Sequence, residues 1–169
     1  MRTWLDRLYE AAGRIAALFM IGTLVFVLLG IFGRLLGFHV RGTDAYAGYC
    51  MAACGFLALA YTLRRNEHIR VTLLLSHVPP AVRKALEVWC HVLALALSGI
   101  LAYYCLRLAW QSRTFNDIST GNDATPLWIP QIAMALGTVI LFVAFVDAFV
   151  AVLRDGQKQE TGDEPARIE

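Results

Sequence analysis

Apolar residues are gathered into four long blocks, and polar segments separate them. The first block runs from residue 15 to residue 33 and contains no charged residue. In a helix its 19 residues would extend roughly 28 Å, close to the thickness of the hydrocarbon core of a bilayer. Three further blocks have the same character. The pattern predicts an all-α integral membrane protein with four transmembrane helices, at about 15–36, 45–63, 86–110 and 127–153.

The longest polar interruption, residues 64–89, indicates how the chain is oriented. It carries five cations, which are Arg64, Arg65, Arg70, Arg83 and Lys84. Short segments rich in Lys and Arg stay on the cytoplasmic side, because these residues resist translocation. With both termini also inside, eleven of the 15 Lys and Arg residues are cytoplasmic and four are outside. We therefore predict that both termini are cytoplasmic.

The central loop, and in one alternative residues 1–14, are predicted to lie along the inner membrane surface. In the central loop, apolar residues recur at the spacing of one helical face, at Val71, Leu74, Leu75 and Val78. We predict a short amphipathic interfacial helix there, between helices two and three. Residues 1–14 fit either a second amphipathic helix on the inner surface or a frayed tail.

Two further predictions concern the cytoplasmic side, namely lipid contacts of the central loop and the state of the C-terminal tail. Arg64, Arg65 and Arg70 are predicted to contact inner-leaflet lipids, since each cation near anionic headgroups is attracted by about 1 kcal/mol. Residues 156–169 are polar and charged. They are predicted to form a disordered cytoplasmic tail that follows a membrane domain of residues 1–155.

Small residues recur at helical spacing in two of the predicted spans. The stripe in the second helix consists of Gly48, Ala52 and Gly55, and the stripe in the fourth consists of Ala144, Ala148 and Ala151. Small side chains allow two helices to approach closely in lipid. Each stripe is therefore predicted to be a packing face, either within this chain or against a partner chain.

Composition narrows the classes of function. Hydrophobic residues make up 58% of the chain and charged residues 17%, whereas soluble domains are about half apolar and a quarter charged. The formal net charge of +2 gives no reason to expect a nucleic-acid partner. The sequence contains no zinc-protease, P-loop, nucleophile-elbow or dinucleotide-binding motif. We therefore predict no catalytic activity and no cofactor.

Only a few residues within the spans are candidates for chemistry. The four cysteines lie in apolar blocks without a C-x-x-C pair, which favours a role as small hydrophobic residues over a disulfide or a metal site. A haem would need histidines facing each other within the bilayer, and only His91 lies in a predicted span. Asp147 is the acid deepest within a span. It is predicted to form an intramembrane ion pair with Arg14 or with a cation of the central loop.

The central loop is similar to a known family. The run from Asn66 to Leu74 reads N-E-H-I-R-V-T-L-L, and the residues that continue the pattern are Leu75, Pro79, Pro80 and Arg83. A second similarity begins at Ser119 with a polar outer segment, and continues with Pro126, Trp128, Ile129, Pro130 and Gly137. Both segments resemble the DctQ family, the small membrane subunits of tripartite ATP-independent periplasmic (TRAP) transporters. This chain has Thr72 where many relatives carry an acidic residue.

The resemblance implies a role in a three-part transporter of the bacterial inner membrane. In such a system a periplasmic binding protein delivers an organic acid to a large sodium-coupled membrane subunit. The small subunit braces the large one and helps the binding protein to dock. Arg113 and Asp117, in the outer loop, then become candidates for contact with the binding protein, with solvated loop charges as the alternative. The transported substrate would be selected by the other chains.

Two other functions remain open on the sequence. One is a membrane anchor or b-type cytochrome subunit of a redox enzyme, for which His91 would be the candidate ligand. The other is a small exporter that works alone. The first helix lacks the mid-membrane carboxylate that a proton-coupled exporter of this size would use, which weighs against that function.

Overall fold

The described part of the chain folds into four long helices. The structure, a computed structural model, describes residues 2–38, 40–64, 79–121 and 123–162. The helices are α1 (Arg2–Leu35), α2 (Thr43–Arg64), α4 (Pro80–Thr114) and α5 (Trp128–Gly162). Each contains a segment long and apolar enough to cross a membrane, so the prediction of an all-α fold with four such helices is confirmed.

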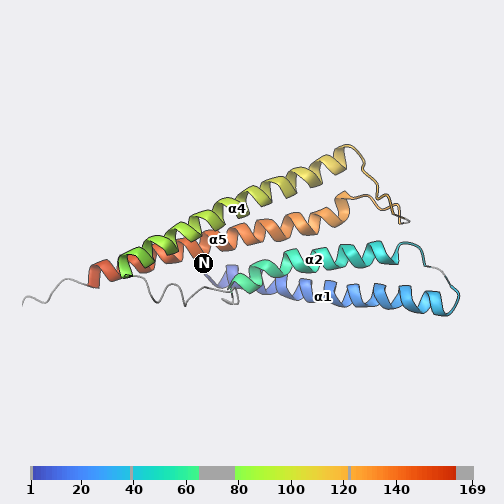
Figure 1. The fold of residues 1–169 in the computed structure, drawn as a ribbon, viewed down its shortest axis with the longest axis horizontal. Helices are drawn as coiled ribbons and strands as arrows, with labels where there is room; N and C mark the ends of the chain where they lie inside the picture. The colour runs from blue at the N-terminus through green and yellow to red at the C-terminus, as the bar shows by residue number, and fades with distance from the viewer. Residues whose placement is uncertain (1, 39, 65–78, 122, 163–169) are drawn as a thin grey trace, which may run out of the picture.

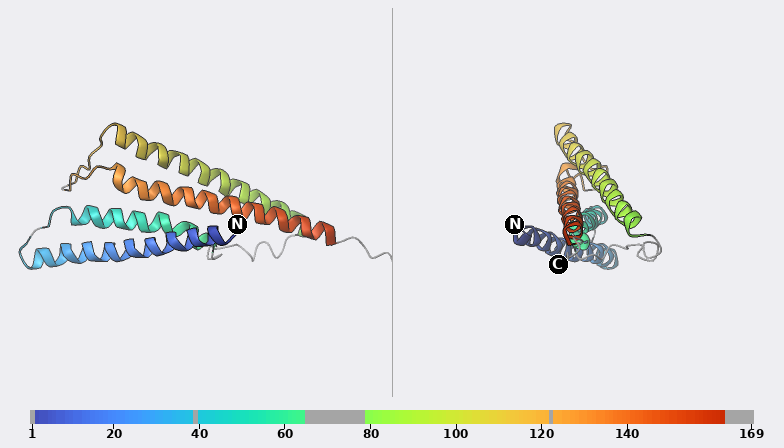
Figure 2. Two further views of the ribbon diagram at one scale, coloured as in Figure 1. Left: turned by 180° about the vertical axis from the view of Figure 1, so that it is seen from behind. Right: turned by 90° about the vertical axis from the view of Figure 1, so that its left-hand side faces the viewer.

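The helices lie in a row rather than in a closed bundle. Extensive contacts join α1 to α2, α2 to α5, and α5 to α4, which gives the spatial order α1–α2–α5–α4. Figure 1 shows two antiparallel hairpins, α1/α2 and α4/α5, that meet along α2 and α5. Figure 2 shows the same order from behind and from one end. Because the row is one helix thick, most apolar side chains in it are exposed to the surroundings.

Small residues bring neighbouring helices close together. A Cβ atom on Gly137 of α5 would lie 2.6 Å from the backbone of Phe56 in α2, so only glycine fits there. On α4 the buried residues are small as well, namely Ser98, Ala102, Cys105 and Ser112. Since α5 is the helix that α4 packs against, this stripe forms the joint within the second hairpin.

A small core lies near the start of α1. The ring of Tyr9 is 1% exposed and packs with Ala60 of α2 and Ala144 of α5, and partly buried Leu5, Leu63 and Ile140 surround it. The frayed-tail prediction for residues 1–14 is therefore wrong, because α1 runs through residues 2–14 and Tyr9 packs against two other helices. A helix is present there, as the other alternative predicts, but it is continuous with the first span, and its position on the inner membrane surface stays a prediction.

The helices extend beyond the predicted spans. Helix α4 begins at Pro80 and ends at Thr114, and α5 continues to Gly162. Residues 156–162 are therefore helical where a disordered tail is predicted, since hydropathy detects only the apolar part of a helix. The predicted interfacial helix, with Arg65 and Arg70, lies outside the described residues, as does the tail after residue 162.

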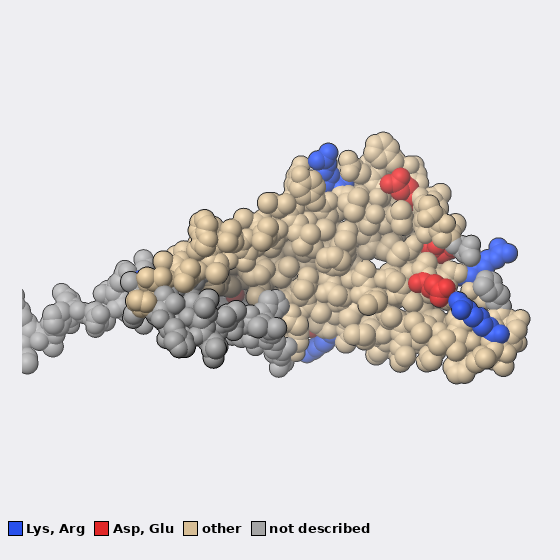
Figure 3. Space-filling view, viewed as in Figure 1, with Lys and Arg blue, Asp and Glu red and all other residues tan. Residues whose placement is uncertain are grey.

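The distribution of exposed side chains agrees with a membrane-spanning layer. In Figure 3, most of the coloured Lys, Arg, Asp and Glu side chains lie toward the end of the molecule that carries the loop between α4 and α5, and most of the remaining described surface in this view is uncharged. Trp89 and Trp110 are both exposed on α4, and the interval between them corresponds to about 31 Å of helix. Tryptophan favours the two membrane interfaces, and this interval matches the hydrocarbon thickness.

Candidate functional site

The loop between α4 and α5 is folded compactly by its own backbone. The Asp117 amide donates to the Ser112 carbonyl, the Leu127 amide to the Asp117 carbonyl, and the Ser119 amide to the Thr125 carbonyl, at 2.9–3.0 Å. Ile118 and Pro126 form an isolated antiparallel bridge. These paired backbone groups hold the backbone of the loop in place at both ends.

Asp123 fastens this loop to α2. Its carboxylate accepts hydrogen bonds from the Ser119 hydroxyl at 2.8 Å and from the Tyr49 hydroxyl, 74 residues away in sequence, at 3.1 Å. Beside it, the Thr125 hydroxyl donates to the Tyr46 oxygen at 3.2 Å. The Tyr46 ring in turn stacks on Phe26 of α1, with centroids 5.4 Å apart. One polar cluster thus connects α1, α2 and the loop between α4 and α5.

Hydrogen bonding keeps Asp123 ionised. Desolvation acts to raise its pKa, but the hydroxyls of Thr125, Ser119 and Tyr49, together with its own backbone, stabilise the carboxylate and lower the pKa from 3.8 to about 2. The carboxylate is therefore a permanent acceptor at any pH near neutrality.

This lowered pKa predicts when the loop detaches. A carboxyl group whose pKa falls on folding stabilises the folded form above its ordinary pKa, and that contribution disappears as the pH falls through the folded-state pKa. We expect protection of the Ser119 and Leu127 amides from hydrogen exchange to hold down to about pH 4 and to be lost between there and about pH 2. Asp123→Asn should remove this acid dependence. Loss of protection in the wild type well above pH 4 would contradict the assignment.

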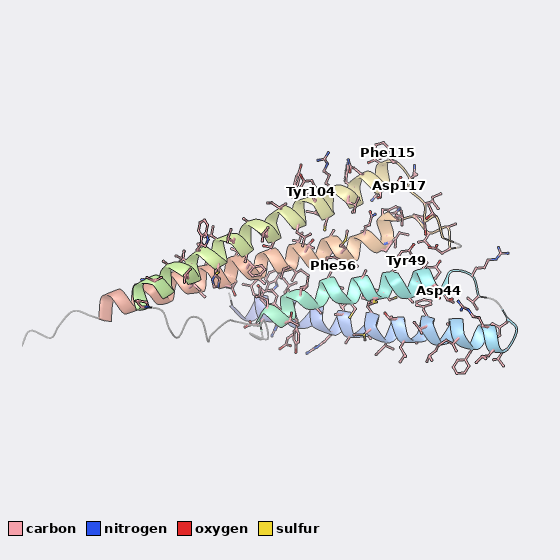
Figure 4. All side chains as sticks on the ribbon, in the orientation of Figure 1. Asp44, Tyr49, Phe56, Tyr104, Phe115 and Asp117 are labelled. Carbon is pink, nitrogen blue, oxygen red and sulfur yellow. The ribbon has the colours of Figure 1, made fainter. Side chains whose placement is uncertain are left out.

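Apolar side chains project from the loop between α4 and α5. Phe115 is 73% exposed and Ile118 is 58% exposed, and Asp117 beside them is exposed as well. Figure 4 shows Phe115 and Asp117 at the C-terminal end of α4. Arg113, the other predicted contact residue, is exposed but holds its guanidinium carbon 5.4 Å from the ring centroid of Trp128. The loop therefore presents an apolar surface edged by charge.

The two small-residue stripes have different surroundings. Gly48, Ala52 and Gly55 of α2 are all exposed, and a Cβ on either glycine would meet nothing within 4 Å. This set is called the open face of α2 below. In contrast, Ala144 is buried in the core with Tyr9, and Ala148 and Ala151 are half-buried. The stripe on α5 therefore packs within the chain, and the open face of α2 does not.

Two candidates for intramembrane chemistry lie on neighbouring helices, His91 on α4 and Asp147 on α5. Asp147 and His91 are each half-buried on different helices. Arg14, one predicted partner of Asp147, forms an ion pair with Glu10 of its own helix at 3.3 Å, and the ion pair of Asp147 stays a prediction. Within the described ranges, no three His, Cys, Asp or Glu side chains are grouped as metal ligands would be, and the four cysteines are free thiols.

Sequence reasoning missed the residues of the polar cluster around Asp123. Tyr46 and Tyr49 are one turn apart near the start of α2, a spacing that places two hydroxyls on one face at the end of the helix. This spacing was the available signal. The partner, Asp123, lies in an ordinary polar turn, and nothing in its local sequence indicates a contact with α2.

Together these features define a multi-pass membrane protein, in which a row of apolar helices carries a fastened outer loop and one unpacked helix face. The sequence model for the DctQ component of tripartite ATP-independent periplasmic transporters matches residues 23–155, most of the chain. The chain therefore belongs to the DctQ family and is the small component of a TRAP transporter. No curated protein sequence matches it. The family works with a large membrane subunit and a binding protein.

Proposed function

We propose that this chain is a non-catalytic subunit of the bacterial inner membrane that braces a large sodium-coupled permease. The permease takes up an organic acid that a periplasmic binding protein delivers. Both termini of the chain are cytoplasmic, and the outer loop is periplasmic. The observation that supports the bracing role is the open face of α2, a stripe of small residues that is exposed and that no described helix covers.

The position of this face supports a protein partner over lipid. Helix α2 is the least apolar of the four candidate spans, although it lies in the middle of the row, between α1 and α5. A face in permanent contact with lipid tails gains from large apolar side chains, whereas Gly and Ala allow another helix to approach closely. We therefore expect a helix of the large subunit to pack against the open face.

Recovery of the assembled complex tests the proposal directly. The tagged chain, extracted from native membranes in mild detergent, should be purified together with a much larger polytopic protein at equal stoichiometry. Reconstituted with this partner and a binding protein, it should support organic-acid uptake that requires a sodium gradient. Recovery of the chain alone, or with a soluble redox enzyme, would overturn the bracing role.

Filling the open face should weaken the assembly. In Ala52→Leu, the larger side chain projects into the space that a partner helix occupies, and overpacking of a helix contact costs about 1–3 kcal/mol. We expect a reduced yield of the complex with unchanged expression of the isolated chain. Ala96→Leu, at an exposed position on α4, is the matched control. Equal yields for the two variants would count against the open face as the interface.

The outer loop is the second contact surface that we propose. Phe115 and Ile118 lie after Trp110, which marks the outer interface, on a loop whose backbone is held in place at both ends. Exposed apolar side chains on such a backbone, beyond the hydrocarbon region, favour contact with a soluble protein. The binding protein would then contact an apolar centre edged by Asp117. Arg113 would act mainly through its stacking on Trp128.

Removing the apolar centre should weaken docking of the binding protein. Burial of one Phe side chain contributes about 1.5–3 kcal/mol, so the double variant Phe115→Ser/Ile118→Ser should lower the affinity at least about tenfold. The measurement is the dissociation constant of the binding protein for the reconstituted complex. Trp4→Ser, which alters an exposed aromatic side chain at the opposite end of the molecule, is the control. An unchanged dissociation constant in the double variant would exclude this surface.

A further inference from the structure

A cleft opens at the outer end of the first hairpin. Its volume is about 180 Å³, and Leu29, Gly30, Arg34, Phe38, Thr43 and Asp44 are among its lining residues. The wall is formed by the end of α1, the segment that follows it and the start of α2. Figure 4 shows Asp44 at this end of α2. Gly121 of the loop between α4 and α5 also lines the cleft, whereas no residue of the open face of α2 does.

One charge of each sign lies at the cleft. The Arg34 guanidinium nitrogen is 3.4 Å from a carboxylate oxygen of Asp44, and both side chains are largely exposed. An exposed ion pair of this kind is weak, since water screens it and both side chains are free to move. A ligand that carries both an anionic and a cationic group can therefore insert between the two residues and contact each of them.

Two glycines keep the walls close together. A Cβ on Gly33 would lie 2.8 Å from the Phe38 carbonyl oxygen, and one on Gly30 would lie 3.2 Å from the Thr43 hydroxyl. Side chains at these positions would crowd the segment between the helices and fill the space beside it. The shape of the cleft thus depends on the two glycines.

The cleft lies at the boundary of the apolar span. Arg34 is the first charged residue after the uncharged run from residue 15 to residue 33. Leu29 lines the cleft, and Val25 and Leu18 lie one and three turns below it on the same side of α1, where all three are exposed. A ligand with charged groups in the cleft and hydrocarbon chains along α1 would match both regions.

We propose that this cleft binds a phospholipid whose headgroup contains a phosphate and a primary ammonium group, as in phosphatidylethanolamine. Arg34 donates hydrogen bonds to the phosphate, and Asp44 accepts them from the ammonium. Leu29 and Phe38 contact the glycerol region and the start of the acyl chains. An anionic lipid without the ammonium group would leave Asp44 beside the phosphate without compensation, so the cleft discriminates against it. This inference does not depend on the partner subunits.

Native mass spectrometry of the full chain tests the proposal. The protein, in a mild detergent, is mixed with equal amounts of phosphatidylethanolamine and phosphatidylglycerol that have identical acyl chains. We expect the ethanolamine lipid to be retained preferentially, by about 1.5-fold to fivefold, the range typical of exposed charge pairs. Asp44→Asn should abolish the preference, and Arg34→Gln should reduce retention of both lipids. Arg107→Gln, an exposed cation on α4 outside the cleft, should change neither.

A second arm distinguishes the lipid from its free headgroup. Soluble phosphoethanolamine should not compete at concentrations that match the lipid, because the acyl chains contribute to binding along α1. Competition by the free headgroup would show that the cleft binds a small zwitterion and would overturn the proposal of a lipid ligand. Equal retention of the two lipids by the wild type, or a preference that survives Asp44→Asn in a variant with an unchanged unfolding temperature, would overturn the proposal.

Discussion

Gly137→Ala is expected to loosen the joint between the two hairpins. The new methyl carbon would lie 2.6 Å from backbone atoms of Phe56, and a backbone cannot move aside as the end of a side chain can. Helices α2 and α5 would have to separate along the contact that holds the hairpins together. Overpacking of this kind costs about 1–3 kcal/mol, and a backbone clash belongs at the upper end of that range. The midpoint of thermal unfolding in mild detergent should fall accordingly.

Gly55→Ala is the matched control for this experiment. It makes the same chemical change in a helix, at a position where the added carbon meets nothing within 4 Å. Without a clash, replacing glycine by alanine within a helix stabilises by roughly 0.5–1 kcal/mol. The two variants should therefore shift the midpoint in opposite directions. Equal shifts would show that helix propensity, rather than the approach of α5 to Phe56, determines the result.

Tyr9→Ala should produce the largest loss of stability among single changes. The side chain is 1% exposed and fills the space between Ala60 and Ala144, both too small to close the gap. Truncating a large buried aromatic side chain costs about 3–5 kcal/mol, of which part is the cavity that remains. We expect a much lower unfolding midpoint, measured in the same detergent, and proteolytic cleavage within residues 2–14 of α1.

Two control variants show whether lost packing, rather than loss of any aromatic side chain from α1, lowers the midpoint. Trp4→Ala removes an even larger aromatic side chain from the same helix, but Trp4 is 70% exposed, so the midpoint should barely change. Tyr9→Phe retains the ring and should retain most of the stability. If Tyr9→Ala and Trp4→Ala lower the midpoint equally, then the core around Tyr9 does not hold α1 in place.

The four helices could be predicted from the sequence because each is marked by an uninterrupted apolar block. Their order in space could not, since it depends on which faces fit together. The contact of Gly137 with Phe56 joins residues 81 positions apart, and hydropathy carries no information about it. The frayed-tail prediction for residues 1–14 is wrong for a related reason. Tyr9 lies among charged residues, and nothing nearby in the sequence indicates that Ala60 and Ala144 enclose it.

The candidate sites were predictable to a different extent. Spacing alone identified both small-residue stripes, but not that Ala144 packs inside the chain while Ala52 stays exposed. Both stripes consist only of small residues, and the sequence does not show that Tyr9 of α1 packs against the one on α5. Asp117 is exposed, and its contact with the binding protein stays a prediction. The apolar pair Phe115 and Ile118 was overlooked because exposed hydrophobic side chains have no distinctive pattern within a polar loop.

The open row of helices has a consequence for biogenesis. Each hairpin is complete within itself, so α1/α2 and α4/α5 are expected to enter the bilayer as separate units and to join afterwards through α2 and α5. A chain without its partner subunit would keep the open face of α2 uncovered, a surface that membrane proteases of the quality-control system can recognise. The cellular amount of this subunit is therefore expected to follow the supply of its partner, because unassembled copies are degraded rather than stored.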